Sequence, residues 1–154
     1  MSGAVGDGLE TSSMSADRTF VDTNLLTYLF DDAEPTKQRA AARRLETEQQ
    51  DRELVLSTQV LQELYVSLTK GKYPIATPEI AEAAVRHAAG GYTIVQIDAP
   101  LVLSAIAVCR RDRVSFWDAL ILRAASAAGC DRLLSEDLNP GRTVDGVTIE
   151  NPFA

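Results

Sequence analysis

Cysteine and histidine are scarce in this chain. Its 154 residues include two Cys and one His. The cysteines, Cys109 and Cys130, cannot build a disulfide framework and lack the spacing of metal ligands. Both lie in apolar segments of helical character, so we expect reduced, buried thiols. His87 stands mid-helix, far in sequence from every candidate acid, which indicates a surface residue and argues against a histidine-based ribonuclease mechanism.

Long hydrophobic runs are also missing. No stretch reaches the roughly 18 apolar residues that a membrane-spanning helix needs, and the longest apolar segment, residues 99–109, is predicted to be a buried core helix. The first 17 residues are rich in Gly and Ser and lack the basic and apolar regions of a signal peptide. We therefore expect a disordered leader over residues 1–17, one folded domain over residues 18–154, and a cytoplasmic protein without membrane contact.

Positive charge is in deficit. The formal net charge is −7, which does not favour non-specific binding of nucleic acid. Contact with a polyanion would need bound cations or local basic patches, and solvated helix faces explain the basic clusters equally well. The clusters are Lys37, Arg39, Arg43 and Arg44; Lys70 and Lys72; and Arg110, Arg111 and Arg113. Serine and cysteine nucleophile motifs and a glycine-rich phosphate loop are absent from the sequence.

The sequence does contain a regular alternation of short apolar strands and amphipathic helices. Strands are predicted at residues 18–22, 53–57, 92–98 and 131–137, with a possible fifth at 147–152. Helices are predicted at residues 23–30, 35–50, 58–70, 77–90, 99–113 and 115–130. This alternation predicts a parallel sheet covered by helices on both faces. In such sheets ligands bind beyond the carboxyl ends of the strands.

Four acids are predicted to meet at that edge of the sheet. Asp22 closes the first strand, Glu63 lies about one turn into the helix after the second, and Asp137 follows the fourth. Asp118 lies in the first turn of the helix that leads into the fourth strand, and such a helix starts at the same edge. All four side chains can therefore converge on one rim.

Each acid also has a purely structural explanation. Asp22 could cap the helix after it, and Ser115 with Asp118 matches a capping box. Glu63 could be a solvated helix residue, and Asp137 a turn residue. Together these explanations weaken, because four independent coincidences must share one edge. Carboxylates crowded in one pocket repel each other unless cations neutralise them, and Mg²⁺ or Mn²⁺ with oxygen ligands is the natural partner.

Four segments resemble the acidic motifs of PIN-domain ribonucleases, in particular the VapC toxins of bacterial and archaeal toxin–antitoxin pairs. The segments are FVDTNLLTYLF, QVLQELY, SFWDALIL and LLSEDLNPG. No single segment is very specific, but the set stands in the family's order and at its usual separations, and it covers nearly all of residues 18–154. The resemblance implies an α/β fold, a three-layer α/β/α sandwich around a central parallel sheet.

The resemblance also implies which residues act. It carries the acidic set over to Asp22, Glu63, Asp118 and Asp137. In this interpretation Asp22, Asp118 and Asp137 bind metal and Glu63 supports them. Asn24 and Ser135 match polar residues near the first and last acids. The family is less uniform at the fourth acid, so Glu136 remains an alternative to Asp137.

The implied activity is metal-dependent cleavage of single-stranded RNA by a homodimeric toxin that a cognate antitoxin inhibits. Divalent ions can activate a water, polarise the phosphoryl group and stabilise the leaving oxygen. Two alternatives stay open: a PIN nuclease of RNA processing or decay without an antitoxin, and a catalytically silent PIN-like binding module. A phosphatase or phospho-acceptor domain is disfavoured, because Asn24 stands two residues after Asp22 and no Lys lies near a strand end.

Overall fold

The first strand of the chain lies in the middle of a six-stranded sheet. The computed structural model describes residues 17–154, and the strand order is β3-β2-β1-β4-β6-β5. The strands are β1 (Arg18–Val21), β2 (Glu53–Ser57), β3 (Thr93–Val95), β4 (Arg132–Leu134), β5 (Thr143–Val144) and β6 (Val147–Glu150). All pairings are parallel except the antiparallel pair β5–β6. The predicted parallel sheet is thus confirmed, with one short antiparallel edge strand that the sequence did not indicate.

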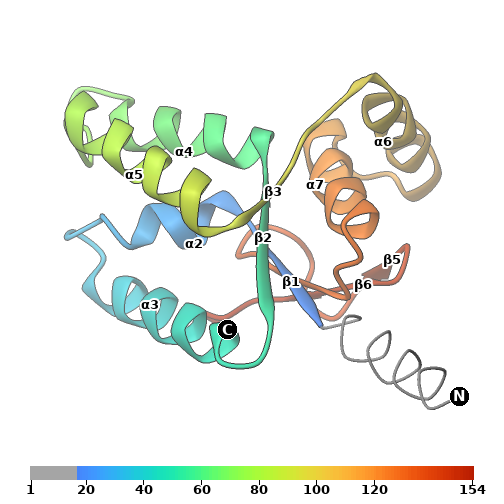
Figure 1. Cartoon of the computed structure of the whole chain (residues 1–154), viewed down its shortest axis with the longest axis horizontal. Helices are drawn as coiled ribbons and strands as arrows, with labels where there is room; N and C mark the ends of the chain where they lie inside the picture. The colour runs from blue at the N-terminus through green and yellow to red at the C-terminus, as the bar shows by residue number, and fades with distance from the viewer. Residues whose placement is uncertain (1–16) are drawn as a thin grey trace, which may run out of the picture.

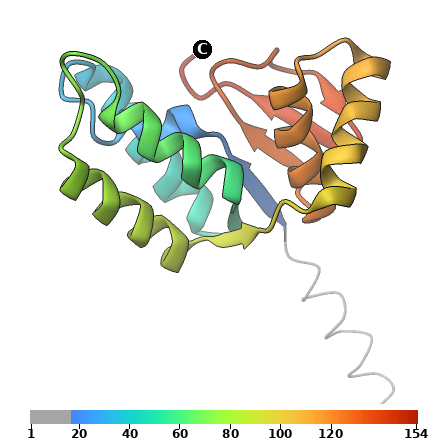
Figure 2. The ribbon, with the colours of Figure 1, turned by 90° about the horizontal axis from the view of Figure 1, so that it is seen from above.

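Helices cover both faces of the sheet, as predicted for a three-layer sandwich. They are α2 (Thr23–Tyr28), α3 (Pro35–Gln49), α4 (Thr58–Thr69), α5 (Pro78–Gly91), α6 (Ala99–Asp112) and α7 (Phe116–Ala127). α7 packs on the sheet with α6 against it, while α3 lies on the other side (Figure 1). α4 and α5 run side by side on one flank, away from the α6–α7 pair (Figure 2). Among the described residues, no helix is long and apolar enough to cross a membrane.

Cross-strand pairing of apolar residues fixes the register of the central strands. Phe20 pairs with Val55 on one side and Leu133 on the other, and all three side chains are fully buried. One step further, Val21 pairs with Leu134. β1 and β4 therefore end level with each other, since a shift of one residue would turn every buried side chain to the other face. The residues that follow these two strands emerge side by side at one edge.

The amino edge of the sheet is closed by a network of arginines around one buried acid. Glu48, near the end of α3, has 3% of its surface exposed. It accepts hydrogen bonds from the Thr19 hydroxyl at 2.7 Å, from Arg132 at 2.6 Å and from Arg44 at 3.0 Å. Burial alone would raise the pKa of Glu48, but these donors and the charge of Arg132 lower it below its usual value. This network ties α3 to β1 and β4.

Some predictions about individual side chains were wrong. α6 is not a buried core helix, because α7 covers one side of it and leaves Leu103 67% and Ile106 42% exposed. Cys130 is buried as expected, but Cys109 on α6 is only half-buried. His87 is exposed, as predicted. The leader predicted for residues 1–17 falls on positions that, except for Asp17, lie outside the described residues.

Candidate functional site

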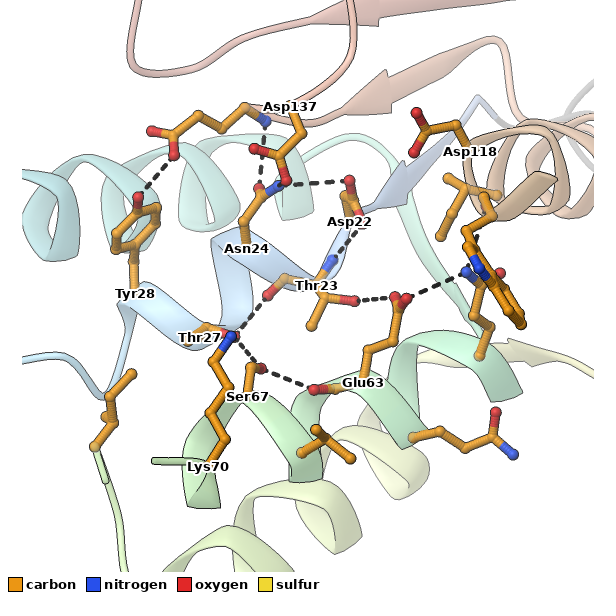
Figure 3. Close-up of a pocket in the computed structure, with 17 residues that line it drawn as sticks. Asp22, Thr23, Asn24, Thr27, Tyr28, Glu63, Ser67, Lys70, Asp118 and Asp137 are labelled. Carbon is orange, nitrogen blue, oxygen red and sulfur yellow. Dashed lines mark hydrogen bonds between the residues drawn. The ribbon is translucent and has the colours of Figure 1, made fainter. Parts of the chain in front are cut away.

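A cavity of about 660 Å³ opens at the carboxyl edge of the sheet. Its wall combines Asp22 and residues of α2 with residues of α4, α7 and the segment after β4, which are far apart in the sequence. All four acids of the predicted set line it: Asp22, Glu63, Asp118 and Asp137. Figure 3 shows Asp22 near the centre, Asp137 and Glu63 on either side of it, and Asp118 on α7 across the cavity.

Asp22 is the buried member of the set, with 8% of its surface exposed. Its Oδ1 accepts the Thr23 backbone N–H at 2.7 Å, so it does cap α2. Its Oδ2 accepts the Ser135 hydroxyl at 2.7 Å. The two residues lie side by side because β1 and β4 end level with each other. Capping and a functional role are therefore compatible, because one oxygen caps the helix and the other faces Ser135.

Asn24 joins the first and last acids. Its amide nitrogen Nδ2 donates to Asp22 Oδ2 at 3.4 Å and to Asp137 Oδ2 at 3.1 Å. Its carbonyl oxygen Oδ1 accepts the backbone N–H of Glu136 at 3.3 Å. The amide thus places its weakly positive end between two carboxylates, where a cation would also be stabilised (Figure 3).

Glu63 is held in place by two neighbours. It accepts the Thr23 hydroxyl at 2.9 Å and the Gln59 amide at 3.3 Å. The Gln59 amide also donates to the Trp117 carbonyl oxygen at 3.4 Å, which links α4 to the start of α7. Gln59 Oε1 is buried and has no hydrogen-bond partner within the described part of the chain. Glu63 is therefore a positioned side chain rather than a solvated helix residue.

Asp118 does not complete the predicted capping box. Ser115 caps α7 by accepting the Asp118 backbone N–H at 3.1 Å. The Asp118 carboxylate returns no hydrogen bond to Ser115, and among residues 17–154 it makes no other side-chain hydrogen bond. The carboxylate therefore remains free to bind a ligand in the cavity.

Glu136 lies beside the acid set but is neutralised. It accepts the Tyr28 hydroxyl at 2.7 Å and pairs with Lys37 at 2.6 Å. Burial raises its pKa, but Lys37 and Tyr28 outweigh this effect and lower the pKa below its usual value. Lys37 also lies over the rings of Tyr28 and Phe153. Between the two adjacent acids, Asp137 contacts Asn24 and faces the centre of the site, whereas Glu136 is committed to Lys37.

The acid set lacks compensating charge. None of its four carboxylates forms an ion pair within the described residues. Burial raises the pKa of Asp22 to about 6, its bonds with Ser135 and Thr23 counteract this, and the charges of Glu63 and Asp137 add to the rise. An acid whose surroundings disfavour its ionised form and so raise its pKa is a candidate functional residue.

The geometry limits how a metal ion could bind. Within residues 17–154, no three His, Cys, Asp or Glu side chains lie close enough to hold one ion between them. Mg²⁺ keeps several waters and is usually bound through one or two carboxylates. Asp22 and Asp137, both bonded to the Asn24 amide, offer such a pair of hard oxygen donors. The residues therefore fit a largely hydrated divalent cation better than a fully protein-coordinated one.

Several lining residues were not found from the sequence. Thr23, Gln59 and Lys70 line the cavity, as does Trp117, which is 62% exposed. Thr23 and Trp117 each stand next to a predicted acid, in the DTN and FWD segments, so adjacency to the motif was an available signal. Gln59 reaches the cavity from α4, four positions before Glu63, and carries no such signal, whereas Lys70, at the end of α4, was noted only as part of a basic cluster with Lys72.

Comparison with known proteins agrees with this fold. Among curated proteins, no sequence match reaches significance. A solved structure of VapBC2 from Rickettsia felis bound to a DNA fragment from its promoter superimposes with a TM-score of 0.64 at 16% identity, covering 87% of this chain and 98% of that one. A toxin–antitoxin complex from Klebsiella pneumoniae gives a TM-score of 0.64 at 21% identity, covering 87% and 97%.

A third structure is Mycobacterium tuberculosis VapC20, described as a toxin that cleaves the sarcin–ricin loop. It gives a TM-score of 0.62 at 20% identity, covering 82% of this chain and 97% of that one. At these identities the three structures show a shared fold. The family model of the PIN domain matches residues 19–144, a range that contains all four acids and the whole cavity wall. The chain therefore belongs to the PIN domain family.

Proposed function

We propose that this protein is a Mg²⁺- or Mn²⁺-dependent endoribonuclease that acts as the toxin of a toxin–antitoxin pair. One observation carries the nuclease proposal: Asp22 is buried at the end of the central strand, beside Asp137 and Glu63, with no cationic partner among the described residues. Such repulsion is relieved when a divalent cation binds. Membership in the PIN family supports this proposal.

The side chains divide the work by position. Asp22, Asp118 and Asp137 would hold the metal, directly or through water, and the metal would supply Lewis-acid activation for phosphodiester hydrolysis. Ser135 and Thr23 orient Asp22 through both of its oxygens. Asn24 keeps Asp137 next to Asp22. Glu63, fixed by Thr23 and Gln59, faces the same cavity and can orient or deprotonate a water.

The toxin proposal rests on the structural neighbours. Those described above include two toxin–antitoxin complexes or their components and one RNA-cleaving toxin. We propose that a cognate antitoxin places a cationic or apolar segment at the acidic cavity, where it would relieve repulsion and exclude metal. A PIN nuclease of RNA processing without an antitoxin, and a catalytically silent module, are the alternatives. The uncompensated acids disfavour the silent module, because such a protein gains nothing from their repulsion.

One substitution tests the nuclease proposal. Asp22→Asn keeps the size and capping ability of Asp22, since Asn and Asp cap helices about equally well, but it removes the charge. RNA cleavage with Mg²⁺ or Mn²⁺, measured by mapping new 5′ ends in total RNA, should fall by more than about a hundredfold, since even indirect metal partners contribute about 10–100-fold. The matched control is Asp51→Asn, at an exposed acid in the turn after α3. Near wild-type cleavage by soluble Asp22→Asn protein would refute the metal-site proposal.

Growth assays test the toxin proposal separately. Expression of the chain alone should arrest growth, and co-expression of a cognate antitoxin should restore it. If the soluble wild-type protein cuts RNA but leaves growth unchanged, the RNA-processing alternative is correct.

We also propose a homodimer with an interface on the helices between residues 35 and 70. Sedimentation equilibrium checks this, and a monomer at micromolar concentration would contradict it.

A further inference from the structure

Trp117 stands out as a large aromatic side chain that the fold does not bury. It is 62% exposed, yet it lines the cavity and directly precedes Asp118 in the chain. Exposure of a tryptophan to water forgoes the burial of a large apolar surface, so its position on the rim of an acidic site calls for an explanation. The chain contains one Trp.

The ring is held from one side. Phe116 contacts it edge-on, with ring centroids 5.1 Å apart and an interplanar angle of 76°. Phe116 itself is half-buried and packs against the core. The Gln59 amide bonds the Trp117 carbonyl oxygen at 3.4 Å and Glu63 at 3.3 Å, which fixes the backbone under the ring relative to an acid of the site. Trp117 is therefore a positioned platform rather than a loose side chain.

The rest of the cavity suits a nucleotide. Apolar side chains of Val66, Ile75 and Ile121 share the wall with the hydroxyls of Thr27 and Ser67. Lys70 also lines the cavity and forms no ion pair within the described residues. An aromatic face, hydroxyl groups and a cation in one cavity form the combination by which proteins bind unpaired bases and the adjoining phosphates.

We propose that Trp117 stacks on an unpaired base of the RNA substrate, next to the phosphate that the acid set cleaves. This inference rests on the proposed nuclease function and adds a positioning residue to it. Stacking on an indole tolerates every base, because each has a π face, but it excludes bases that are paired in a duplex. Trp117 therefore confers a preference for single strands rather than for a sequence.

The intrinsic fluorescence of the protein reports on this contact directly, because its one tryptophan is the proposed platform. Asp22→Asn protein serves as the parent, since it should bind RNA without cutting it. A mixed-sequence single-stranded RNA oligonucleotide should quench the emission in a saturable titration, and the same sequence annealed as a duplex should not. Affinity for the labelled oligonucleotide is measured in parallel by anisotropy.

Substitutions complete the test. In the parent, Trp117→Ala should weaken binding of the single strand by roughly 5- to 150-fold, and Trp117→Phe should restore most of the affinity. In the otherwise wild-type enzyme, Trp117→Ala should raise KM more than it lowers kcat. The matched control is Tyr73→Ala, at an aromatic residue that is 85% exposed and does not line the cavity. Melting temperatures verify that each variant folds.

The outcomes separate this inference from the proposed function. If the wild-type protein cuts RNA while Trp117→Ala binds and cuts normally and the emission of the parent stays constant at saturation, the stacking proposal alone is overturned. It is likewise overturned if Trp117→Ala weakens binding of the antitoxin but not of RNA. If the wild-type protein cuts no RNA and the parent binds none, both proposals fall together.

Discussion

Asp22 and Glu48 are both buried acids beside β1, with 8% and 3% of their surfaces exposed, but their surroundings differ in charge. At the amino edge, Glu48 meets Thr19 and three arginines, Arg44, Arg52 and Arg132, and its pKa is lowered. At the carboxyl edge, Asp22 meets Ser135, Thr23 and Asn24, with further acids nearby, and its pKa is raised. Burial is thus common to both acids, and compensation by positive charge distinguishes the structural acid Glu48 from the candidate site acid Asp22.

The largest effect on stability is expected from the compensated acid. Glu48→Gln leaves three arginines facing an uncharged amide in a buried network, so the free energy of unfolding should fall by about 3–5 kcal/mol. The control is Glu82→Gln, which removes an exposed pair with Arg86 and should change stability by less than about 0.5 kcal/mol. Urea denaturation of both variants checks this. Equal free energies of unfolding for Glu48→Gln and Glu82→Gln would show that the ion pairs of Glu48 with the arginines do not stabilise the protein.

The uncompensated acid should respond in the opposite direction. The pKa of Asp22 is about 6 in the folded protein and near 3.8 when exposed, so ionisation of Asp22 costs stability as the pH rises between these values. Without metal, Asp22→Asn should therefore stabilise the protein by up to about 3 kcal/mol at pH 7. The gain should shrink as the pH falls from 6 to 4. A melting temperature below wild type at pH 7 would contradict this.

The two acids should also show opposite pH dependences. Because the pKa of folded Glu48 is lowered, its stabilisation is present above its ordinary pKa of 4.5 and is lost as the pH falls through the folded value. The deficit of Glu48→Gln relative to wild type should therefore shrink on acidification. Thermal unfolding of wild type and both variants between pH 3 and 7 separates the two contributions. A pH-independent difference for either variant would refute its assignment.

Divalent cations should affect one edge and not the other. At a Mg²⁺ concentration of 10–100 times its Kd, the wild-type protein should gain about 1.4–2.7 kcal/mol. Glu48→Gln should gain the same amount, and Asp22→Asn much less. Melting temperatures with Mg²⁺ and with a chelator measure this. If Mg²⁺ stabilises Asp22→Asn as much as wild type, the cation binds elsewhere.

The smallest effect is expected at Asn24. Asn24→Ala removes the amide that separates Asp22 from Asp137, so the metal-free protein should lose about 1–2 kcal/mol. The control is Gln62→Ala, because Gln62 lines the same cavity without a side-chain hydrogen bond among the described residues. Chemical denaturation with chelator present measures both variants. Equal effects would show that the amide has no special role between the acids.

Much of this fold could be predicted from the sequence because apolar periodicity and capping residues are local signals. The side chains of Ser57, Thr77 and Ser115 cap the starts of α4, α5 and α7, respectively. β5 could not be predicted, because it is two residues long and forms only by pairing with β6. The exposure of Leu103 depends on which side α7 covers, and nothing in α6 itself encodes that choice.

In the candidate site, too, some features could be predicted from the sequence and others could not. That the four acids share one edge followed from the topology of parallel sheets. The Asn24 amide between Asp22 and Asp137 and the ion pair of Glu136 with Lys37 could not be predicted. Both depend on side-chain directions and on contacts between segments that lie about a hundred residues apart in the sequence. Sequence patterns therefore predict at which edge of the sheet the site lies. The hydrogen bonds and ion pairs between its side chains depend on how the helices and strands pack.

The central position of β1 has a further consequence for local unfolding of the protein. Its amides are bonded on both sides, and the Asp22 N–H itself donates to the Leu134 carbonyl at 3.0 Å. Amide hydrogens of β1 should therefore exchange with solvent only through global unfolding, while those of the edge strands β3 and β5 exchange through local fraying. Asp22 cannot retreat from its acidic neighbours by a backbone fluctuation. The rigid backbone of β1 therefore keeps the Asp22 carboxylate next to the other acids of the site even without a bound ion.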